Sequence, residues 1–284
     1  MPKQKPTRKS RSFDPHAMAH WLVNAHARRE AFTQAPASIR ANNQEEAIAV
    51  QQSFVKLKSL QCGPAVGWKI ALSTPVMQHM VGLDAPVAAR LHKKQIVRAP
   101  AQTALSSYTR LIVEFEIAVR LGRDLKVQAS PHTASSVKEA VGFVAPAIEI
   151  ADDRMAVYPE MHDKGLELLA DNAWNEGVIL GPERSVQEAL TSLGTEGEQD
   201  GLARMRGQVH LNGQLIGSGR GADLMGHPLE ALAWLANAAN ERGEYLKRGQ
   251  LCILGSLVSS KFPKLHDHFR FELDGFEPIE LSVV

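Results

Sequence analysis

Three carboxylates in two apolar segments are the residues of this sequence most able to do chemistry. Glu114 and Glu116 lie in VEFEIAV, and Glu149 lies in VAPAIEI. Side chains alternate between the two faces of a strand, so Glu114 and Glu116 share one face and the apolar residues share the other. Carboxylate oxygens are the ligands that Mg²⁺ and Mn²⁺ prefer. The pattern predicts a divalent-metal site at these three residues, although a solvated strand face could show the same Glu-x-Glu spacing.

The elements that must position these carboxylates are strands, preceded by a helical segment. Helices are expected to begin at Asp14-Pro15 and near Asn43, and a third is expected over residues 226–243. Asn212-Gly213 predicts a two-residue hairpin turn. Because strands and helices do not alternate as βαβ units, the expected class is α+β, with helices packed on a mixed sheet. Seven segments predict strands or hairpins: 66–72, 111–121, 144–150, 176–181, 207–219, 250–258 and 267–273.

The bulk composition excludes several classes of protein. The 284 residues carry a formal net charge of +1, which gives no overall field to recruit nucleic acid or an anionic membrane. No apolar run approaches the roughly 20 residues that span a bilayer. The two cysteines, Cys62 and Cys252, lack a CxxC spacing. We therefore expect a cytoplasmic protein in a reducing compartment, with neither a nucleic-acid nor a membrane partner.

The composition also suggests a division of the chain. Residues 1–12 are basic and contain no acidic residue, so we expect a disordered tail there. Residues 13–65 are predicted to be an N-terminal helical segment. Residues 66–284 hold all the predicted strands and are expected to form the metal-binding catalytic domain.

Six segments occur in a characteristic order: VGWKIALSTPVMQHMVGLDAP, VEFEIAVRLGRDL, PAIEIADDR, LADNAWNEGVILG, GSGRGADLMGHPLEALAWLAN and GQLCILGSLVSS. Together they resemble the 2-hydroxypenta-2,4-dienoate hydratase and 4-oxalocrotonate decarboxylase branch of the fumarylacetoacetate hydrolase superfamily. The resemblance runs from about residue 45 to the C-terminus. It implies a mixed β-roll that holds Mg²⁺ or Mn²⁺ on a Glu-x-Glu pair and a later Glu, and these match Glu114, Glu116 and Glu149.

Lys69 is the candidate cation beside the predicted metal. A 2-oxo acid can chelate a hard cation, which then stabilises the enolate formed when a bond of the carbon chain breaks. Three carboxylates around a divalent ion leave a net charge of −1, which disfavours an anionic substrate. A nearby lysine would offset this charge, and the resemblance implies a functional lysine at Lys69. A surface lysine on a strand is the alternative.

One departure from the family pattern concerns proton transfer. In hydratases the resemblance implies an Asp-x-Pro-Asp-x-Gly stretch whose second Asp is the acid/base. This chain matches at Asp84 and Pro86 but has Val87 at the acid/base position and Ala89 in place of the glycine. Losing a general acid or base costs roughly 10²–10⁴-fold in rate, and decarboxylation needs no base in its bond-breaking step. The departure favours a decarboxylase, unless Asp84 or a histidine acts instead.

Five further positions are expected to shape substrate binding. Asp171 and Asn172 match a family motif and are predicted to orient the substrate carboxylate or a metal-bound water, with a hydrogen-bonded turn as the alternative. Ser256 is predicted to hydrogen-bond the substrate carboxylate, although a structural role at a strand end is equally compatible. Trp174 and Asn175 replace small residues common in relatives, so we expect a reshaped pocket.

These observations predict a metal-dependent lyase acting on small 2-oxo or 2-hydroxydienoic acids in the catabolism of aromatic-derived compounds. A 2-keto-4-pentenoate hydratase-like activity is the first reading. A 4-oxalocrotonate-type decarboxylase, favoured by Val87, and a non-catalytic subunit of a decarboxylase–hydratase complex are the alternatives. A carbon–carbon hydrolase is the runner-up enzyme; it would need a His–Glu pair, and the N-terminal half shows no evident pair of this kind, with His26 the one histidine left open. We expect a homo-oligomer or a complex with a related hydratase or decarboxylase.

Overall fold

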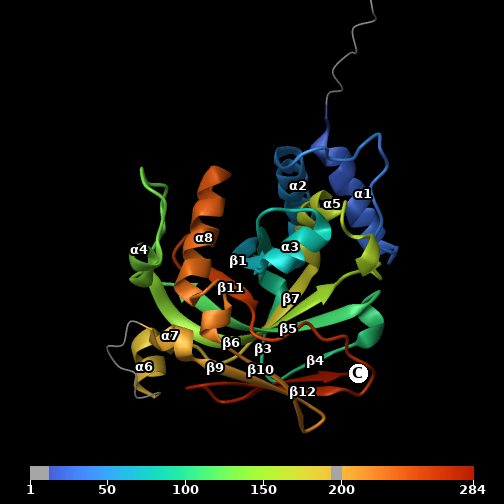
Figure 1. The fold of residues 1–284 in the computed structure, drawn as a ribbon. Helices are drawn as coiled ribbons and strands as arrows, with labels where there is room; N and C mark the ends of the chain where they lie inside the picture. Colours follow the sequence, from blue (N-terminus) through green and yellow to red (C-terminus); the bar gives the residue numbers. More distant parts are fainter. Residues whose placement is uncertain (1–12, 193–199) are drawn as a thin grey trace, which may run out of the picture.

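The structure is a computed structural model that describes residues 13–192 and 200–284. The predicted disordered tail, residues 1–12, lies outside the described residues. Two sheets are stacked, and Figure 1 shows the smaller sheet below the larger one, with helices α1 and α2 above. The combination of helices with mixed sheets confirms the predicted α+β class. None of the helices in the described ranges is both long and apolar enough to cross a membrane.

The larger sheet has eight strands and carries the predicted carboxylates. Strand β1 pairs in parallel with β11, and β3 pairs in parallel with β7, while the other pairs are antiparallel. Its order is β2 (Val87–His92), β1 (Ala65–Ala71), β11 (Leu251–Ser256), β5 (Leu111–Leu121), β6 (Val141–Asp152), β7 (Asn175–Leu180) and β3 (Ile96–Arg98), with β8 (Arg184–Ser185) paired to β6.

The smaller sheet has five strands and closes the fold on the other side. The predicted Asn212-Gly213 hairpin joins β9 and β10, and Asn212 and Gly213 have the positive φ values, 51° and 83°, that such a turn requires. The strand order of the smaller sheet is β10 (Gln214–Arg220), β9 (Arg206–Leu211), β12 (His268–Leu273), β13 (Ile279–Val283) and β4 (Ala101–Thr103).

The helices begin at the residues that the sequence indicates. The Asp14 side chain accepts a hydrogen bond from the His16 N–H, and the Asn43 side chain accepts one from the Glu46 N–H at 2.8 Å. His227 caps the third predicted helix by accepting from the Leu229 N–H at 2.9 Å. The helices are α1 (Pro15–Ala27), α2 (Gln44–Cys62), α3 (Pro75–Val81), α4 (Ala134–Lys138), α5 (Gly165–Ala170), α6 (Val186–Thr191), α7 (Gly201–Arg204) and α8 (Pro228–Glu241).

Apolar packing fixes the orientation of strand β5. Its alternate residues Val113, Phe115, Ile117 and Val119 are buried in one core, which they share with β9, β12 and α8. A second core packs α1 and α2 against the larger sheet. Phe54 and Leu22 share this core with Ile112 of β5 and Ala151 of β6. Because one face of β5 is committed to the first core, Glu114 and Glu116 are directed to the other face, as the alternation predicts.

Candidate metal centre

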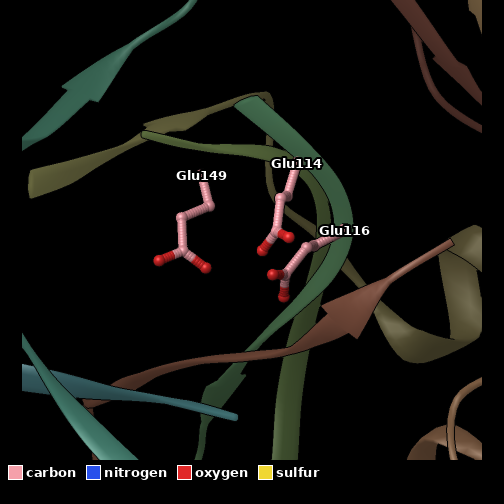
Figure 2. Close-up of side chains that lie close together, drawn as sticks. All are labelled: Glu114, Glu116 and Glu149. Carbon is pink, nitrogen blue, oxygen red and sulfur yellow. The ribbon is translucent and has the colours of Figure 1, made fainter. Parts of the chain in front are cut away.

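The register of β5 against β6 brings the three predicted carboxylates together. Glu114 lies directly opposite Glu149 in this antiparallel pair, and Glu116 lies two residues further along β5. One ligand oxygen from each residue lies within 4.8 Å of the other two. Figure 2 shows the three carboxylates converging from the two strands. Neighbouring β11 places Ser256 opposite Glu116 and so closes one side of the cluster.

Burial and mutual repulsion make this cluster unfavourable for negative charge alone. Glu116 and Glu149 are fully buried, and Glu114 is partly buried. Burial raises the pKa of Glu116 well above its ordinary value, and the nearby Glu149 and Glu114 raise it further. Burial followed by the Glu149 charge also raises the pKa of Glu114. A bound cation would remove this penalty.

Two oxygens of the cluster have no hydrogen-bond partner among the described residues. They are Glu116 Oε1 and Glu149 Oε2, and both are buried. An unsatisfied buried acceptor costs about 1–3 kcal/mol, and more when it is charged. Carboxylate oxygens are hard ligands of the kind that Mg²⁺, Mn²⁺ and Ca²⁺ take. The open oxygens and the converging geometry therefore fit a divalent cation.

Lys69 reaches the same cluster from strand β1. Its side chain is 2% exposed, and its ammonium donates hydrogen bonds to Glu149 Oε1 and, at 3.1 Å, to the Ala173 carbonyl. Burial alone would lower the pKa of Lys69, but the Glu149 and then the Glu114 charges outweigh it and raise the pKa. Lys69 is therefore a fixed positive charge within the cluster, which excludes the alternative of a surface lysine.

Three further groups support the carboxylates and were not predicted as ligand supports. The Ser260 hydroxyl donates to Glu114, and the Gly255 N–H donates to Glu116 Oε2 at 2.8 Å. The Asn175 side chain donates to Glu149 Oε1 at 2.8 Å. The polar run that follows LGSLV was a weak signal for Ser260. Nothing local marks a backbone N–H such as that of Gly255, because its role depends on how β11 pairs with β5.

A cavity of about 330 Å³ opens beside the cluster, and Lys69, Glu114 and Ser256 are among its walls. The Ser256 hydroxyl is already engaged, because it donates to the Val258 carbonyl at 2.8 Å and accepts from the Phe115 N–H at 3.0 Å. Most of the remaining wall is apolar, including Met77, Met80, Ile112, Leu168, Trp174 and Leu257. Polar groups, among them Asp223 and Tyr158, also line it, so the cavity can enclose a small organic acid.

Other predicted positions lie outside this wall. Asp84 is exposed, and it does not contribute to the cavity lining found in the described ranges. Val87 is 1% exposed and packs in the second core. Asp171 and Asn172 are both 1% exposed and lie behind the cavity, where they bind protein groups. Asp171 pairs with Arg154 and His26, while Asn172 binds the backbone of β2.

His26 comes to the same region but does not line the cavity. Its Nε2 contacts Asp171 and its Nδ1 contacts Glu176 at 3.1 Å, so both ring nitrogens are engaged. Lys58 also pairs with Glu176, which completes a buried polar cluster between the N-terminal helices and the sheet. A hydrolytic His–Glu pair would have to reach a substrate, and the residues described around the cavity do not include His26.

Comparison with known proteins places this chain in a family. The model for the fumarylacetoacetate (FAA) hydrolase C-terminal region matches residues 63–284. The chain belongs to this family. A family member from Paraburkholderia xenovorans, a 2-keto-4-pentenoate hydratase, is 29% identical over 233 residues, covering 82% of this chain and 81% of that relative.

Two decarboxylases extend the family comparison. A 4-oxalocrotonate decarboxylase from a Pseudomonas species is 26% identical over 215 residues, covering 76% of this chain and 77% of the relative. The solved 4-oxalocrotonate decarboxylase from Pseudomonas putida G7, complexed with magnesium and adipate, superposes with a TM-score of 0.82 at 22% identity. That superposition covers 99% of this chain and 100% of the other, so the predicted fold of this family is confirmed over nearly the whole chain.

Proposed function

We propose that this chain is a divalent-metal-dependent lyase that acts on small 2-oxo or 2-hydroxydienoic acids, with 2-keto-4-pentenoate hydratase-like activity. The buried cluster of Glu114, Glu116 and Glu149 beside Lys69 and an enclosed cavity carries this proposal. Membership of the family supports it, since its relatives include hydratases and decarboxylases. A role in the catabolism of aromatic-derived compounds and a cytoplasmic location belong to the same proposal.

The carboxylates, Lys69 and the cavity walls would have different roles in the reaction. Glu114, Glu116 and Glu149 would hold magnesium or manganese, and the bound ion would supply Lewis-acid chemistry to a 2-oxo acid. Lys69 lies buried against Glu149, so it would place a positive charge beside the ion and the substrate. Its charge offsets the three carboxylates and favours an anionic substrate. The apolar walls exclude water around the rest of the substrate.

A 4-oxalocrotonate-type decarboxylase is the second candidate, and proton transfer favours it. Hydration needs a general acid or base near the substrate. Asp84 is exposed outside the cavity wall, and Val87 is buried in the second core. Asp223 does line the cavity, however, so a carboxylate that could exchange a proton is also available for hydration. The proposal therefore covers both reactions, and product analysis distinguishes them.

The purified chain with Mg²⁺ should be incubated separately with 2-hydroxypentadienoate and 2-oxohexenedioate. Addition of water to the first would identify a hydratase, and loss of carbon dioxide from the second would identify a decarboxylase, both by product mass. Turnover by the chain alone would dismiss the alternative of a non-catalytic partner subunit. Metal binding without turnover would support that alternative. Light scattering of the same sample would measure its mass in solution and so test the expected homo-oligomer.

The metal assignment is tested by Glu116→Gln, which keeps the shape of the side chain and removes one charge. We expect Mg²⁺ binding by calorimetry to be lost and the metal-free protein to melt no lower than wild type, because the variant relieves crowded negative charge. Glu272→Gln on strand β12, 37% exposed, is the matched control and should bind Mg²⁺ normally. Unchanged affinity in Glu116→Gln would contradict the assignment.

A further inference from the structure

Three consecutive residues behind the metal centre have a left-handed backbone. Asn172, Ala173 and Trp174 have φ values of 53°, 48° and 61°. Residues with a Cβ atom visit this region singly and seldom in runs, because the Cβ then crowds the following carbonyl oxygen. Such a conformation persists only where surrounding groups hold it, and it is concentrated at functional sites. The groups that hold this turn are therefore informative.

Side chains fix the turn at its first residue and just before it. The Asn172 side chain binds strand β2 twice, accepting from the Arg90 N–H at 2.8 Å and donating to the Arg90 carbonyl at 2.9 Å. The preceding Asp171 is fully buried as a side chain between Arg154 and His26. Together these contacts tie the start of the turn to a strand and to helix α1.

The end of the turn is fixed by packing. The Trp174 ring meets Phe32 edge to face, with 5.1 Å between ring centroids. Its indole is 9% exposed and forms part of the cavity wall. The turn is thus held at both ends, which leaves its middle residue, Ala173, with little freedom.

The turn delivers two polar groups to the Lys69–Glu149 pair. The Ala173 carbonyl accepts a hydrogen bond from the Lys69 ammonium at 3.1 Å. Immediately after the turn, the Asn175 side chain donates to Glu149 Oε1 at 2.8 Å, the same oxygen that Lys69 contacts. An ammonium on a four-carbon stem has many rotamers, so a second fixed acceptor restricts where the charge lies. A right-handed turn would direct the Ala173 carbonyl elsewhere.

We propose that the left-handed turn Asn172–Trp174 is a positioning element that fixes the Lys69 ammonium against Glu149, with Asn172 as its positioning residue. Asn172 acts through the backbone and contacts neither the cavity nor the carboxylates. This inference rests on the proposed lyase function only where turnover is the measurement. The position of Lys69 can also be measured without turnover.

The test is Asn172→Gly, because glycine accepts a left-handed backbone but removes both hydrogen bonds to Arg90. We expect kcat to fall roughly 10–100-fold, the effect of a small misplacement of a catalytic group, with Mg²⁺ affinity within about twofold of wild type. Acetylation of Lys69 by acetic anhydride, followed by peptide mass spectrometry, should accelerate about tenfold, because the side chain becomes accessible to the reagent and the free amine that attacks it is no longer held as an ammonium against Glu149. His266→Gly is the control and should change neither readout. His266 also has a left-handed backbone, with φ 69°, but it is exposed and is not among the described residues that line the cavity.

A second variant separates the loss of the Asn172 contacts from a change in the backbone of the turn. Ala173→Gly removes no hydrogen bond and relieves the left-handed backbone, so its melting temperature should equal or exceed that of wild type. Because glycine also accepts the left-handed backbone and the Asn172 contacts remain, we expect its kcat and the labelling rate of Lys69 to match wild type. Wild-type kcat and wild-type labelling in Asn172→Gly would overturn the inference. A wild-type enzyme without turnover would contradict the proposed function, and the labelling rates alone would then decide this inference.

Discussion

Each carboxylate of the metal centre has one oxygen bound by a protein donor. Ser260 holds Glu114, the Gly255 N–H holds Glu116, and Glu149 Oε1 accepts from Lys69 and Asn175. The second oxygens of Glu116 and Glu149 are buried and unsatisfied within the described part of the chain. The protein thus orients each side chain through one oxygen and leaves another for an ion. Donors of this kind commonly contribute 10–100-fold to metal affinity.

Ser260→Ala should therefore weaken Mg²⁺ binding about tenfold while the protein stays folded, because Glu114 loses the donor that orients it. Calorimetric titration with Mg²⁺ measures the change. Ser259→Ala is a control of the same residue type one position earlier, where the hydroxyl accepts from Lys261. Equal affinities in the two variants would show that the Ser260 hydroxyl does not orient a ligand.

At the scale of the elements, local signals were sufficient for β5, β6 and the starts of three helices. Alternation specifies the faces of a strand, and capping residues act within one turn, so both can be predicted from neighbours in sequence. Strand β2 was missed because VAARLH has little intrinsic strand preference, and it is extended by pairing with β1. The turn Asn172–Trp174 was equally beyond local prediction, since distant groups such as Arg90 impose it.

Helix α1 docks through a titratable contact, since His26 bonds Asp171 and Glu176. Burial alone would lower the pKa of His26, but Asp171 outweighs it and the net pKa is raised. A raised histidine pKa stabilises the fold fully below the ordinary value of about 6.5, and this stabilisation is lost as pH rises through the higher folded value.

The free energy of unfolding should thus contain a contribution that is fully present below about pH 6.5, declines as the pH rises above that value, and is absent in His26→Gln. At pH 6 we expect the variant to be less stable by about 1.5–3 kcal/mol, the usual loss for a charged hydrogen bond. Urea titrations across this range measure both quantities. His20→Gln, exposed on the same helix, should retain the wild-type dependence, and a parallel decline in His26→Gln would exclude His26 as the source.

At the scale of the whole molecule, the described residues form three hydrophobic cores, and the second one crosses the predicted boundary near residue 65. Phe54 and Leu22 from the N-terminal helices share it with Leu72, Val81 and Leu168. The helices therefore contribute to the same packed interior as residues next to the cavity. The division into a helical segment and a catalytic domain stays a prediction. Composition and strand spacing indicate where helices give way to strands, and they do not indicate whether the two segments share a core.

Phe54→Ala tests whether this core unfolds as one unit with the sheet. Phe54 is 1% exposed, so the cavity created should lower the free energy of unfolding by about 3–5 kcal/mol. We expect one urea transition that coincides by circular dichroism and tryptophan fluorescence. Leu60→Ala, 82% exposed on the same helix, should change stability by less than about 0.5 kcal/mol. Two separated transitions would instead indicate an independently folding N-terminal segment.

Strand β11 has a consequence for how the enzyme is made. It lies between β1, which carries Lys69, and β5, which carries Glu114 and Glu116, and its parallel pairing with β1 joins Gly67 to Leu251. During synthesis the ammonium strand and the carboxylate strands leave the ribosome long before β11 does. Until Leu251 emerges, the edges of β1 and β5 that pair with β11 have no partner strand, and unpaired edges of this kind are prone to premature pairing. The metal centre can therefore be assembled only late in synthesis, after β11 has left the ribosome.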